Sequence, residues 1–191
     1  PLPVRFYHHY IFPYVLDIAM SSKAFRKPRA RTLAPAHGRI LEIGFGTGLN
    51  LRHYPATITR LSIVDPATLL PAKVARRMAA APYPIQTTHV TAENLPFPDQ
   101  QFETVVSTWT LCTIPDPVLA LHEVGRVLKP GGRFLFLEHG RSDDRTIAVW
   151  QDRLNPIQNV MGCGCHLNRQ IDRLITQSGL TIAHLDRFSM Q

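Results

Sequence analysis

The segment Glu42-Ile-Gly-Phe-Gly-Thr-Gly48 decides the fold class of this chain. It follows the apolar run 39–43, whose composition is typical of a buried strand. Its glycines alternate with other residues, which allows a tight turn and lets a ligand approach the main chain without meeting a Cβ atom. An ordinary turn between a strand and a helix has the same composition, so the interpretation depends on the residues around it.

A carboxylate farther along the chain supports a ligand site. Asp65 follows a second apolar run, residues 61–64, about twenty residues after the glycines. At that position a carboxylate accepts hydrogen bonds from the two hydroxyls of a ribose. A solvated turn aspartate is the alternative, but a strand, glycines and an acid in this order favour a nucleoside site.

The spacing of the glycines indicates which nucleoside is bound. A dinucleotide site reads GxGxxG, whereas this chain reads GxGxG and has Leu49 where the third glycine would stand. Glu42 is also unfavourable beside a pyrophosphate, but it suits a ligand with positive charge. S-adenosylmethionine (SAM) carries a sulfonium and an ammonium, so the pattern favours SAM. An NAD(P)-dependent oxidoreductase is kept as the alternative.

Apolar runs alternate with helical patterns along the rest of the chain. We expect further strands at residues 85–90, 104–107 and 133–137. Between the last two, Asp116 is a natural N-cap before Pro117, and Lys129-Pro-Gly-Gly132 ends the helix. The alternation predicts a Rossmann-like α/β fold, with a doubly wound, mostly parallel sheet and helices on both faces.

Composition and charge divide the chain into two parts. Of its 191 residues, 21 are Lys or Arg and 14 are Asp or Glu, which gives a net charge of +7. Residues 1–37 contain six basic and one acidic side chain, whereas residues 38–191 are nearly neutral. We expect a basic, aromatic, helical extension over 1–37, one domain over 38–191 and no nucleic-acid partner. Three cysteines are too few for a disulfide scaffold, so a reducing, cytoplasmic location is expected.

Four motifs, in this order, make residues 38–138 resemble the class I SAM-dependent methyltransferases. The motifs are the segment 41–48, Val64-Asp-Pro66, the segment 92–99 with 102–106, and the turn 126–133. The resemblance implies SAM as cofactor, S-adenosylhomocysteine as product and methyl transfer as the activity. The expected cofactor site comprises Glu42, Gly44, Gly46, Gly48, Asp65, Pro66, Ala92, Glu93 and Thr108.

A narrower resemblance concerns the acceptor. The segments 110–114, 136–139 and 164–169 are similar to those of small methyltransferases that include mammalian thiol S-methyltransferases, and more loosely to quinone and phospholipid methyltransferases. This implies a small or lipophilic acceptor with a thiol, amine or phenol-like oxygen, and it favours the thiol slightly. A non-catalytic SAM-binding module is the alternative of a different class.

Residues near the expected acceptor site allow several roles. Glu138 and His139 follow the strand 133–137, where ligands bind in open α/β sheets. His139 is the candidate general base because its reference pKa is about 6.5, and a structural histidine is an equal alternative. The run Cys163-Gly-Cys165-His166 lacks the paired spacing of structural zinc sites, so we expect no metal and place Cys165 in a loop beside the acceptor.

The N-terminal extension contains aromatic residues and a run of basic residues. The resemblance implies that Tyr7 and Tyr10 belong to an aromatic lid over the cofactor, with ordinary helix packing as the alternative. It also implies that Trp109, in the segment after the fourth strand, borders the transferred methyl group. The basic run 23–31 reads as a solvated linker or as a peripheral contact with an anionic membrane.

Two expectations concern the last part of the chain. Asn168 is the expected cap of a helix that ends at Gly179. In the family that this chain resembles, the sheet usually ends with two more strands, and residues 180–188 are the one remaining candidate. The resemblance therefore implies that the sheet lacks its terminal strand.

Overall fold

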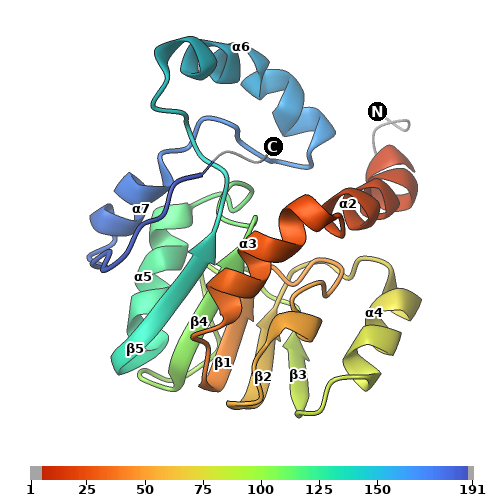
Figure 1. The fold of residues 1–191 in the computed structure, drawn as a ribbon, viewed down its shortest axis with the longest axis vertical. Coiled ribbons are helices and arrows are strands. Elements are labelled where there is room, and N and C mark those ends of the chain that lie inside the picture. The colour runs from red at the N-terminus through yellow and green to blue at the C-terminus, as the bar shows by residue number, and fades with distance from the viewer. Residues whose placement is uncertain (1–5, 189–191) are drawn as a thin grey trace.

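One parallel sheet of five strands organises the molecule, which a computed structural model describes for residues 6–188 (Figure 1). The strand order is β3-β2-β1-β4-β5, and every neighbouring pair is parallel. The strands are β1 (Gly38–Ile43), β2 (Ile58–Val64), β3 (Ile85–Thr88), β4 (Phe102–Thr108) and β5 (Leu128–Leu137). The predicted Rossmann-like, doubly wound sheet is confirmed.

Helices cover both faces of the sheet. The helical elements are η1 (Tyr7–Ile11), α2 (Phe12–Met20), α3 (Lys23–Leu33), η2 (Leu51–His53), α4 (Pro71–Ala79), α5 (Pro117–Val127), α6 (Arg145–Met161) and α7 (Ile171–Gln177). As the sequence predicts, α5 begins at Pro117 with Asp116 as its cap, and the Asp116 carboxylate accepts a hydrogen bond from Leu119 N.

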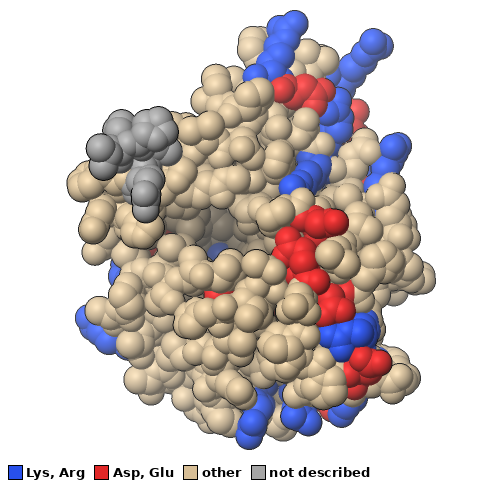
Figure 2. Space-filling model, turned by 180° about the vertical axis from the view of Figure 1, so that it is seen from behind, with Lys and Arg blue, Asp and Glu red and all other residues tan. Residues whose placement is uncertain are grey.

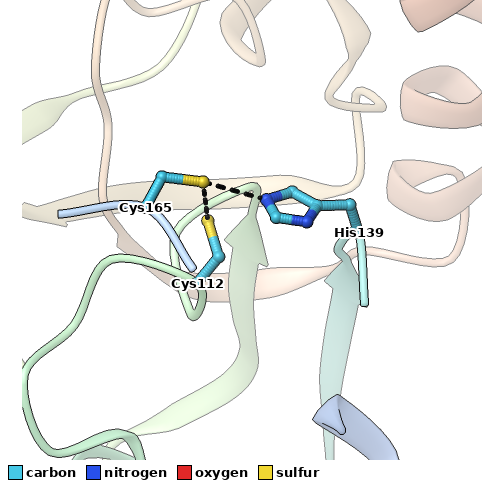
Figure 3. Close-up of side chains that lie close together, drawn as sticks. All are labelled: Cys112, His139 and Cys165. Carbon is cyan, nitrogen blue, oxygen red and sulfur yellow. Dashed lines mark hydrogen bonds between the residues drawn. The ribbon is translucent and has the colours of Figure 1, made fainter. Parts of the chain in front are cut away.

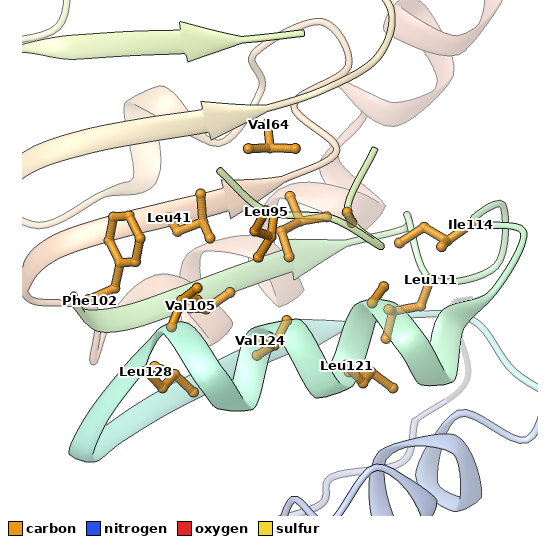
Figure 4. Packing of buried hydrophobic residues seen from close by; sticks show 14 of the residues in the cluster. Leu41, Val64, Leu95, Phe102, Val105, Leu111, Ile114, Leu121, Val124 and Leu128 are labelled. Atoms are coloured by element: carbon orange, nitrogen blue, oxygen red, sulfur yellow. The ribbon is translucent and has the colours of Figure 1, made fainter. Parts of the chain in front are cut away.

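The alternation of side chains along the strands produces two apolar cores. Leu41 and Val105 point to the face that α5 and α7 cover, where they pack with Leu121 and Val124 of α5 (Figure 4). Ile40 and Val106, each one position away, point to the opposite face, which α3, η2 and α4 cover. Both sets are almost fully buried, so the sheet is fixed in register from both sides.

Two expectations about the last part of the chain are wrong. Residues 180–188 form no strand: Leu180 and Ile182 pack against the core beside α5, and no described segment pairs with the outer edge of β5. Asn168 does not cap α7, whose N-cap is Gln170; its side-chain amide donates to the Asp152 carboxylate instead.

The basic run 23–31 is also not a solvated linker. It lies within the amphipathic helix α3, which buries Arg29 and Leu33 against the domain. None of the helices in residues 6–188 combines the length and the hydropathy that a membrane-spanning helix needs.

The carboxyl ends of the strands meet at one edge of the sheet. The loops that follow β1, β2, β4 and β5 all lie at this edge, and α6 and α2 lie beyond it (Figure 1). The hydrogen bond between His8 Nε2 and the Val160 carbonyl, 2.8 Å, joins η1 to the end of α6. This arrangement encloses the candidate site.

Candidate functional site

A large cavity lies at the carboxyl edge of the sheet. Its volume is about 1270 Å³, above the range of about 300–1,000 Å³ that is usual for small-molecule sites. The loops after β1, β2, β4 and β5 line it together with α2 and α3. The back of the molecule has a hollow near its middle, and most of the side chains around this hollow are uncharged (Figure 2). The cavity therefore has room for a nucleoside ligand and a second molecule.

The glycine-rich loop after β1 exposes its backbone to the cavity. Gly44 and Gly46 line the cavity, with φ angles of 71° and 56° that favour glycine. A Cβ atom on Gly44 would lie 2.2 Å from the Thr110 side chain, whereas one on Gly46 would meet nothing within 4 Å. Between this loop and β2 the chain forms turns and the short 3-10 helix η2, and it contains no other helix there.

Asp65 links this loop to the next one. Its Oδ2 accepts from Gly46 N at 2.8 Å, and its Oδ1 accepts from Ala67 N at 2.9 Å. Partial burial raises the pKa of Asp65, and the bonds from these backbone amides oppose that rise. Each carboxylate oxygen keeps acceptor capacity for a ligand hydroxyl.

A buried pair of opposite charges lies below the loop. Glu42 is 1% exposed and accepts from Asn50 Nδ2 at 2.8 Å and from the Tyr54 hydroxyl at 2.7 Å. Burial raises the pKa of Glu42 to about 7. Arg29, 4% exposed, donates to Asn50 Oδ1 and Thr108 Oγ1, so a single amide side chain connects the two charges.

Arg29 reaches the cavity and is the main residue that sequence reasoning missed. Its guanidinium lies 4.6 Å from the centre of the Trp109 ring, and Phe25 contacts the same ring edge-on at 5.2 Å. Phe25, Arg29 and Leu33 are four residues apart and share one face of α3. That spacing was the available signal, but one arginine in a basic run is not distinguishable by charge.

Trp109 is held in an unusual backbone conformation. Its φ is 52°, in the left-handed region that bulky residues rarely adopt. Trp109 N donates to the Leu137 carbonyl at 2.8 Å, which joins the end of β4 to the end of β5. The strained turn directs the indole ring into the cavity, where it meets Arg29.

Most of the expected residues line the cavity, but four do not. The lining includes the expected Gly44, Gly46, Asp65, Pro66, Ala92, Glu93, Thr108, Tyr10, Trp109, His139 and Cys165. The structure places Glu42, Gly48, Tyr7 and Glu138 outside it. Gly48 lies behind the Phe45 ring, and Tyr7 packs against His8 and Phe12.

Glu138 organises the loop after β4 instead of facing the cavity. Its Oε1 accepts from Ser107 Oγ at 2.9 Å and from the backbone amides of Thr110 and Leu111 at 2.9 and 3.1 Å. Burial raises the pKa of Glu138 to about 7, and these donors limit the rise. The carboxylate therefore fixes the turn that carries Trp109 and Cys112.

Two cysteines and a histidine, Cys112, Cys165 and His139, here called the thiol–imidazole cluster, come together in the lining of the cavity (Figure 3). Cys165 Sγ lies 3.2 Å from His139 Nε2 and 3.6 Å from Cys112 Sγ. The hydrogen bonds that Cys165 makes with Cys112 and with His139 hold its pKa below the usual value. The bond to Cys165 raises the pKa of His139. Sequence reasoning placed Cys165 here but did not join it to Cys112.

Helix α2 closes the cavity from the side of the extension. Phe12, Leu16 and Met20 line the cavity from one face of this helix. Asp17, 2% exposed, fastens α2 to α4 through Lys73 Nζ at 2.5 Å and Arg77 Nη1 at 2.6 Å. Arg77 also donates to the Thr47 carbonyl in the glycine-rich loop.

The sequence is similar to those of known methyltransferases. A family model described as "Methyltransferase domain" matches residues 41–136, half of the chain. The chain is 36% identical over 135 residues to the thiol S-methyltransferase TMT1B of Rattus norvegicus, covering 69% of this chain and 55% of the relative. It is 28% identical over 165 residues to the phosphatidylethanolamine N-methyltransferase of Cereibacter sphaeroides, covering 84% of this chain and 80% of the relative.

A solved structure has the same fold. The crystal structure of the YcgJ protein from Bacillus subtilis matches with a TM-score of 0.64 at 23% identity, covering 78% of this chain and 63% of that chain. In the sequence comparison, this chain spans just over half the length of the thiol S-methyltransferase TMT1B of Rattus norvegicus.

Proposed function

The chain belongs to the class I SAM-dependent methyltransferases, and from this premise we propose that it transfers the methyl group of SAM to a lipophilic thiol. One observation carries the proposal: a single cavity is lined both by the glycine-rich loop with Asp65 and by the thiol–imidazole cluster. The nucleoside site and a site for a soft acceptor atom therefore share one enclosed space.

Different residues of the cavity receive the ribose, the adenine and the methionine part of SAM. Asp65 is the acceptor for the ribose hydroxyls, and Pro66 and Ala92 form the wall beside the adenine. The backbone at Gly44 and Gly46, which lines the cavity, receives the methionine part, and the space beside Gly46 is open because nothing lies within 4 Å of the position of a Cβ atom there. Arg29 supplies a cation for the methionine carboxylate.

SAM, when bound, supplies a methyl group activated by its sulfonium charge. Methyl transfer is an in-line displacement, so positioning supplies most of the acceleration. The residues of this chain hold the two reactants in one cavity, and α2 excludes water from it. We therefore assign residues 6–37 the role of a lid, which the ion pairs of Asp17 with α4 fix in place.

Two observations favour a thiol over an amine or a phenol. The acceptor end of the cavity is lined by sulfur and apolar side chains, among them Cys112 and Ile114. The relative from Rattus norvegicus is named a thiol S-methyltransferase. The bacterial relative is named for a lipid amine, which supports a lipophilic acceptor and keeps the amine as the alternative.

Exposed apolar side chains on the outer surface favour the proposal of a lipophilic acceptor. Helix α6 turns its polar face inward, where Gln151 donates to the Gly140 carbonyl and Asn155 accepts from Leu167 N. Its apolar face is exposed to solvent: Ile147, Val149, Trp150, Leu154, Ile157, Val160 and Met161 are each at least 40% exposed. Phe6, Tyr10, Ile11, Tyr14, Val15 and Ile18 of the neighbouring extension are exposed as well. We call these two sets together the apolar rim.

The charges near the apolar rim fit an anionic membrane surface. Residues 6–37 expose Lys23, Arg26, Lys27 and Arg31, whereas their one acid, Asp17, is buried. Aromatic and aliphatic side chains with flanking cations are typical of helices that lie in the membrane interface. The peripheral contact expected from residues 23–31 is therefore proposed for a larger surface that includes α2 and α6.

Calorimetry with SAM, S-adenosylhomocysteine and NAD tests the cofactor. We expect both sulfur ligands to bind, and Asp65→Ala to weaken SAM binding by about 1–3 kcal/mol, because it removes acceptors for the ribose. Asp99→Ala is the matched control, since Asp99 is exposed and pairs with Arg126 away from the cavity. Binding of NAD alone would refute the assignment.

Methyl transfer to a thiol, an amine and a phenol with the same alkyl chain tests the acceptor. We expect the methylated thiol to form fastest, and a longer alkyl chain to lower the KM. Methylation of the amine alone would replace the thiol by the amine while leaving the cofactor assignment intact.

A further inference from the structure

The thiol–imidazole cluster has the composition of a metal site. Cys112 follows β4, His139 follows β5 and Cys165 lies in the loop between α6 and α7, so three separate segments bring their donor atoms together (Figure 3). These atoms all lie within 4.8 Å of one another. We propose that Cys112, His139 and Cys165 bind one zinc ion whose fourth coordination position opens into the cavity.

The distances suit a tetrahedral ion. With bonds of about 2.3 Å to sulfur and about 2.0 Å to nitrogen, two sulfur ligands lie about 3.8 Å apart and a sulfur and a nitrogen about 3.5 Å apart. The observed separations are 3.6 Å between the sulfurs and 3.2 Å between Cys165 Sγ and His139 Nε2. Both separations lie within a few tenths of an ångström of these values, and the third pair, Cys112 Sγ and the His139 donor atom, lies within 4.8 Å, so a small shift of one side chain brings all three donors to an ion. Two thiolates and an imidazole are a donor set that zinc prefers.

The backbone around the cluster holds the donors in place. His166 N donates to the Cys112 carbonyl at 2.9 Å, which joins the two cysteine segments directly. Arg169 donates to the carbonyls of Leu111 and Ile114 on either side of Cys112. Cys163 and Gly164 have φ angles of 52° and 94°, so a tight turn aims Cys165 at the other two residues. These bonds and this turn fix the positions of the three donor side chains.

The fourth position is open on the side of the cavity. All three residues line the cavity, which also contains Gly44, Gly46 and Asp65. Three protein ligands with one open position are characteristic of catalytic zinc sites, whereas structural sites have four. A thiol acceptor that enters the cavity can occupy this position.

The zinc site deepens the proposed function and rests on it for the identity of the acceptor. The acceptor thiol binds zinc as a thiolate and releases its proton to solvent. The thiolate sulfur then forms a bond to the methyl carbon while the bond between that carbon and the sulfonium sulfur breaks. The electron pair of the broken bond stays on S-adenosylhomocysteine. In this role His139 is a zinc ligand and not the general base.

Metal titration of the full chain tests the site directly. After removal of metal with a chelator, we expect one equivalent of zinc to bind in competition with a chromophoric chelator. Cobalt in its place should give the spectrum of a four-coordinate ion with sulfur ligands, and an added alkyl thiol should shift that spectrum. Cys112→Ser and Cys165→Ser should each lower zinc affinity by at least about 100-fold. Cys163→Ser is the matched control, because Cys163 is exposed and lies outside the cluster.

The outcomes separate this proposal from the proposed function. SAM binding, measured on the metal-free chain and on each variant, reports whether the fold and the cofactor site are intact. If SAM binds but zinc does not, the zinc site is refuted and the methyltransferase assignment stands. Thiol methylation that persists in chelator and depends on His139 through a pH profile would also refute the site, because His139 would then act as the base.

Discussion

Gly44 has no room for a side chain. A Cβ atom there would overlap both Thr110 Cγ2 and Thr110 Oγ1 at 2.2 Å, and Thr110 itself is held by its backbone bond to Glu138. The residue also has a positive φ, which costs a non-glycine residue about 1 kcal/mol. Two separate physical constraints therefore require glycine at the point where the backbone faces the cavity.

Comparison of Gly44→Ala with Gly131→Ala separates these constraints. Gly131 has a similar φ of 75°, but a Cβ atom there would meet nothing within 4 Å. We expect Gly131→Ala to lower the free energy of unfolding by about 1 kcal/mol and to leave SAM affinity unchanged. Gly44→Ala should cost a further 1–3 kcal/mol, roughly the range for overpacking, and should weaken SAM binding at least about tenfold. Equal effects of the two substitutions, measured by denaturation and calorimetry, would contradict this account.

At the scale of the elements, one buried carboxylate decides where α2 lies. Asp17 is the only acid of residues 6–37, and it contacts both Lys73 and Arg77 of α4. Arg77 also binds the Thr47 carbonyl, so the same guanidinium connects α2, α4 and the glycine-rich loop. Movement of α2 is thereby coupled to the loop that faces the cofactor.

Arg77→Gln should loosen α2 more than Arg76→Gln does. Both substitutions remove one positive charge from α4, but Arg76 is exposed and makes no ion pair among the described residues. We expect Arg77→Gln to lower the free energy of unfolding by about 1–3 kcal/mol, because it removes charge-assisted hydrogen bonds to a buried carboxylate. It should also make η1 and α2 more accessible to proteases. Equal protease sensitivity of the two variants would show that the Asp17 ion pairs do not hold the lid.

The same ion pairs predict a pH dependence. The hydrogen bonds from Arg77 and Lys73 outweigh the desolvation of Asp17 and hold its pKa far below the usual value. A lowered pKa means that the stabilisation is complete above the unfolded pKa of about 3.9 and is lost as the pH falls through the folded pKa. The wild-type protein should therefore exceed Asp17→Asn in stability by a constant amount above about pH 5, and the difference should shrink below about pH 4. Denaturation at several pH values measures this; a difference that grows toward low pH would contradict it.

The whole molecule combines a nearly neutral body, a basic extension and the apolar rim. The rim is formed by two elements far apart in sequence, η1–α2 and α6, which the bond from His8 to Val160 joins. Both elements also contribute to the cavity, through residues such as Leu16 and Gln158. The proposed membrane contact and the cavity therefore share the same two parts of the chain.

Vesicle sedimentation tests the apolar rim as a membrane contact. We expect the protein to bind phosphatidylcholine vesicles that contain phosphatidylglycerol, and to bind pure phosphatidylcholine more weakly. Trp150→Ala combined with Ile157→Ala should lower the affinity at least about tenfold, because two exposed apolar side chains lose their burial in lipid. Leu119→Ala is the control, since Leu119 is exposed on α5 outside the rim. Equal losses for the double variant and the control would refute the rim as the contact.

The sequence by itself determined the parallel sheet and the places of the glycine-rich loop and Asp65 at the ends of its strands. The strand positions and the cap at Asp116 depend on residues that are neighbours in the chain, and the glycine-rich loop and Asp65 each directly follow a strand. Local patterns of this kind follow from periodicity and backbone geometry, which act over a few residues. The same local reasoning failed at residues 180–188, where an apolar run packs beside α5 instead of pairing with β5.

Only the tertiary structure decided which distant side chains meet. Arg29 is one of five cations in its run, and burial under Trp109 distinguishes it. Cys112 and Cys165 are 53 residues apart in sequence and 3.6 Å apart in space. Likewise, α6 exposes its apolar face because its amide side chains bind backbone groups on the inner side. Such contacts depend on the packing of whole elements against one another, and no local pattern in the sequence encodes that packing.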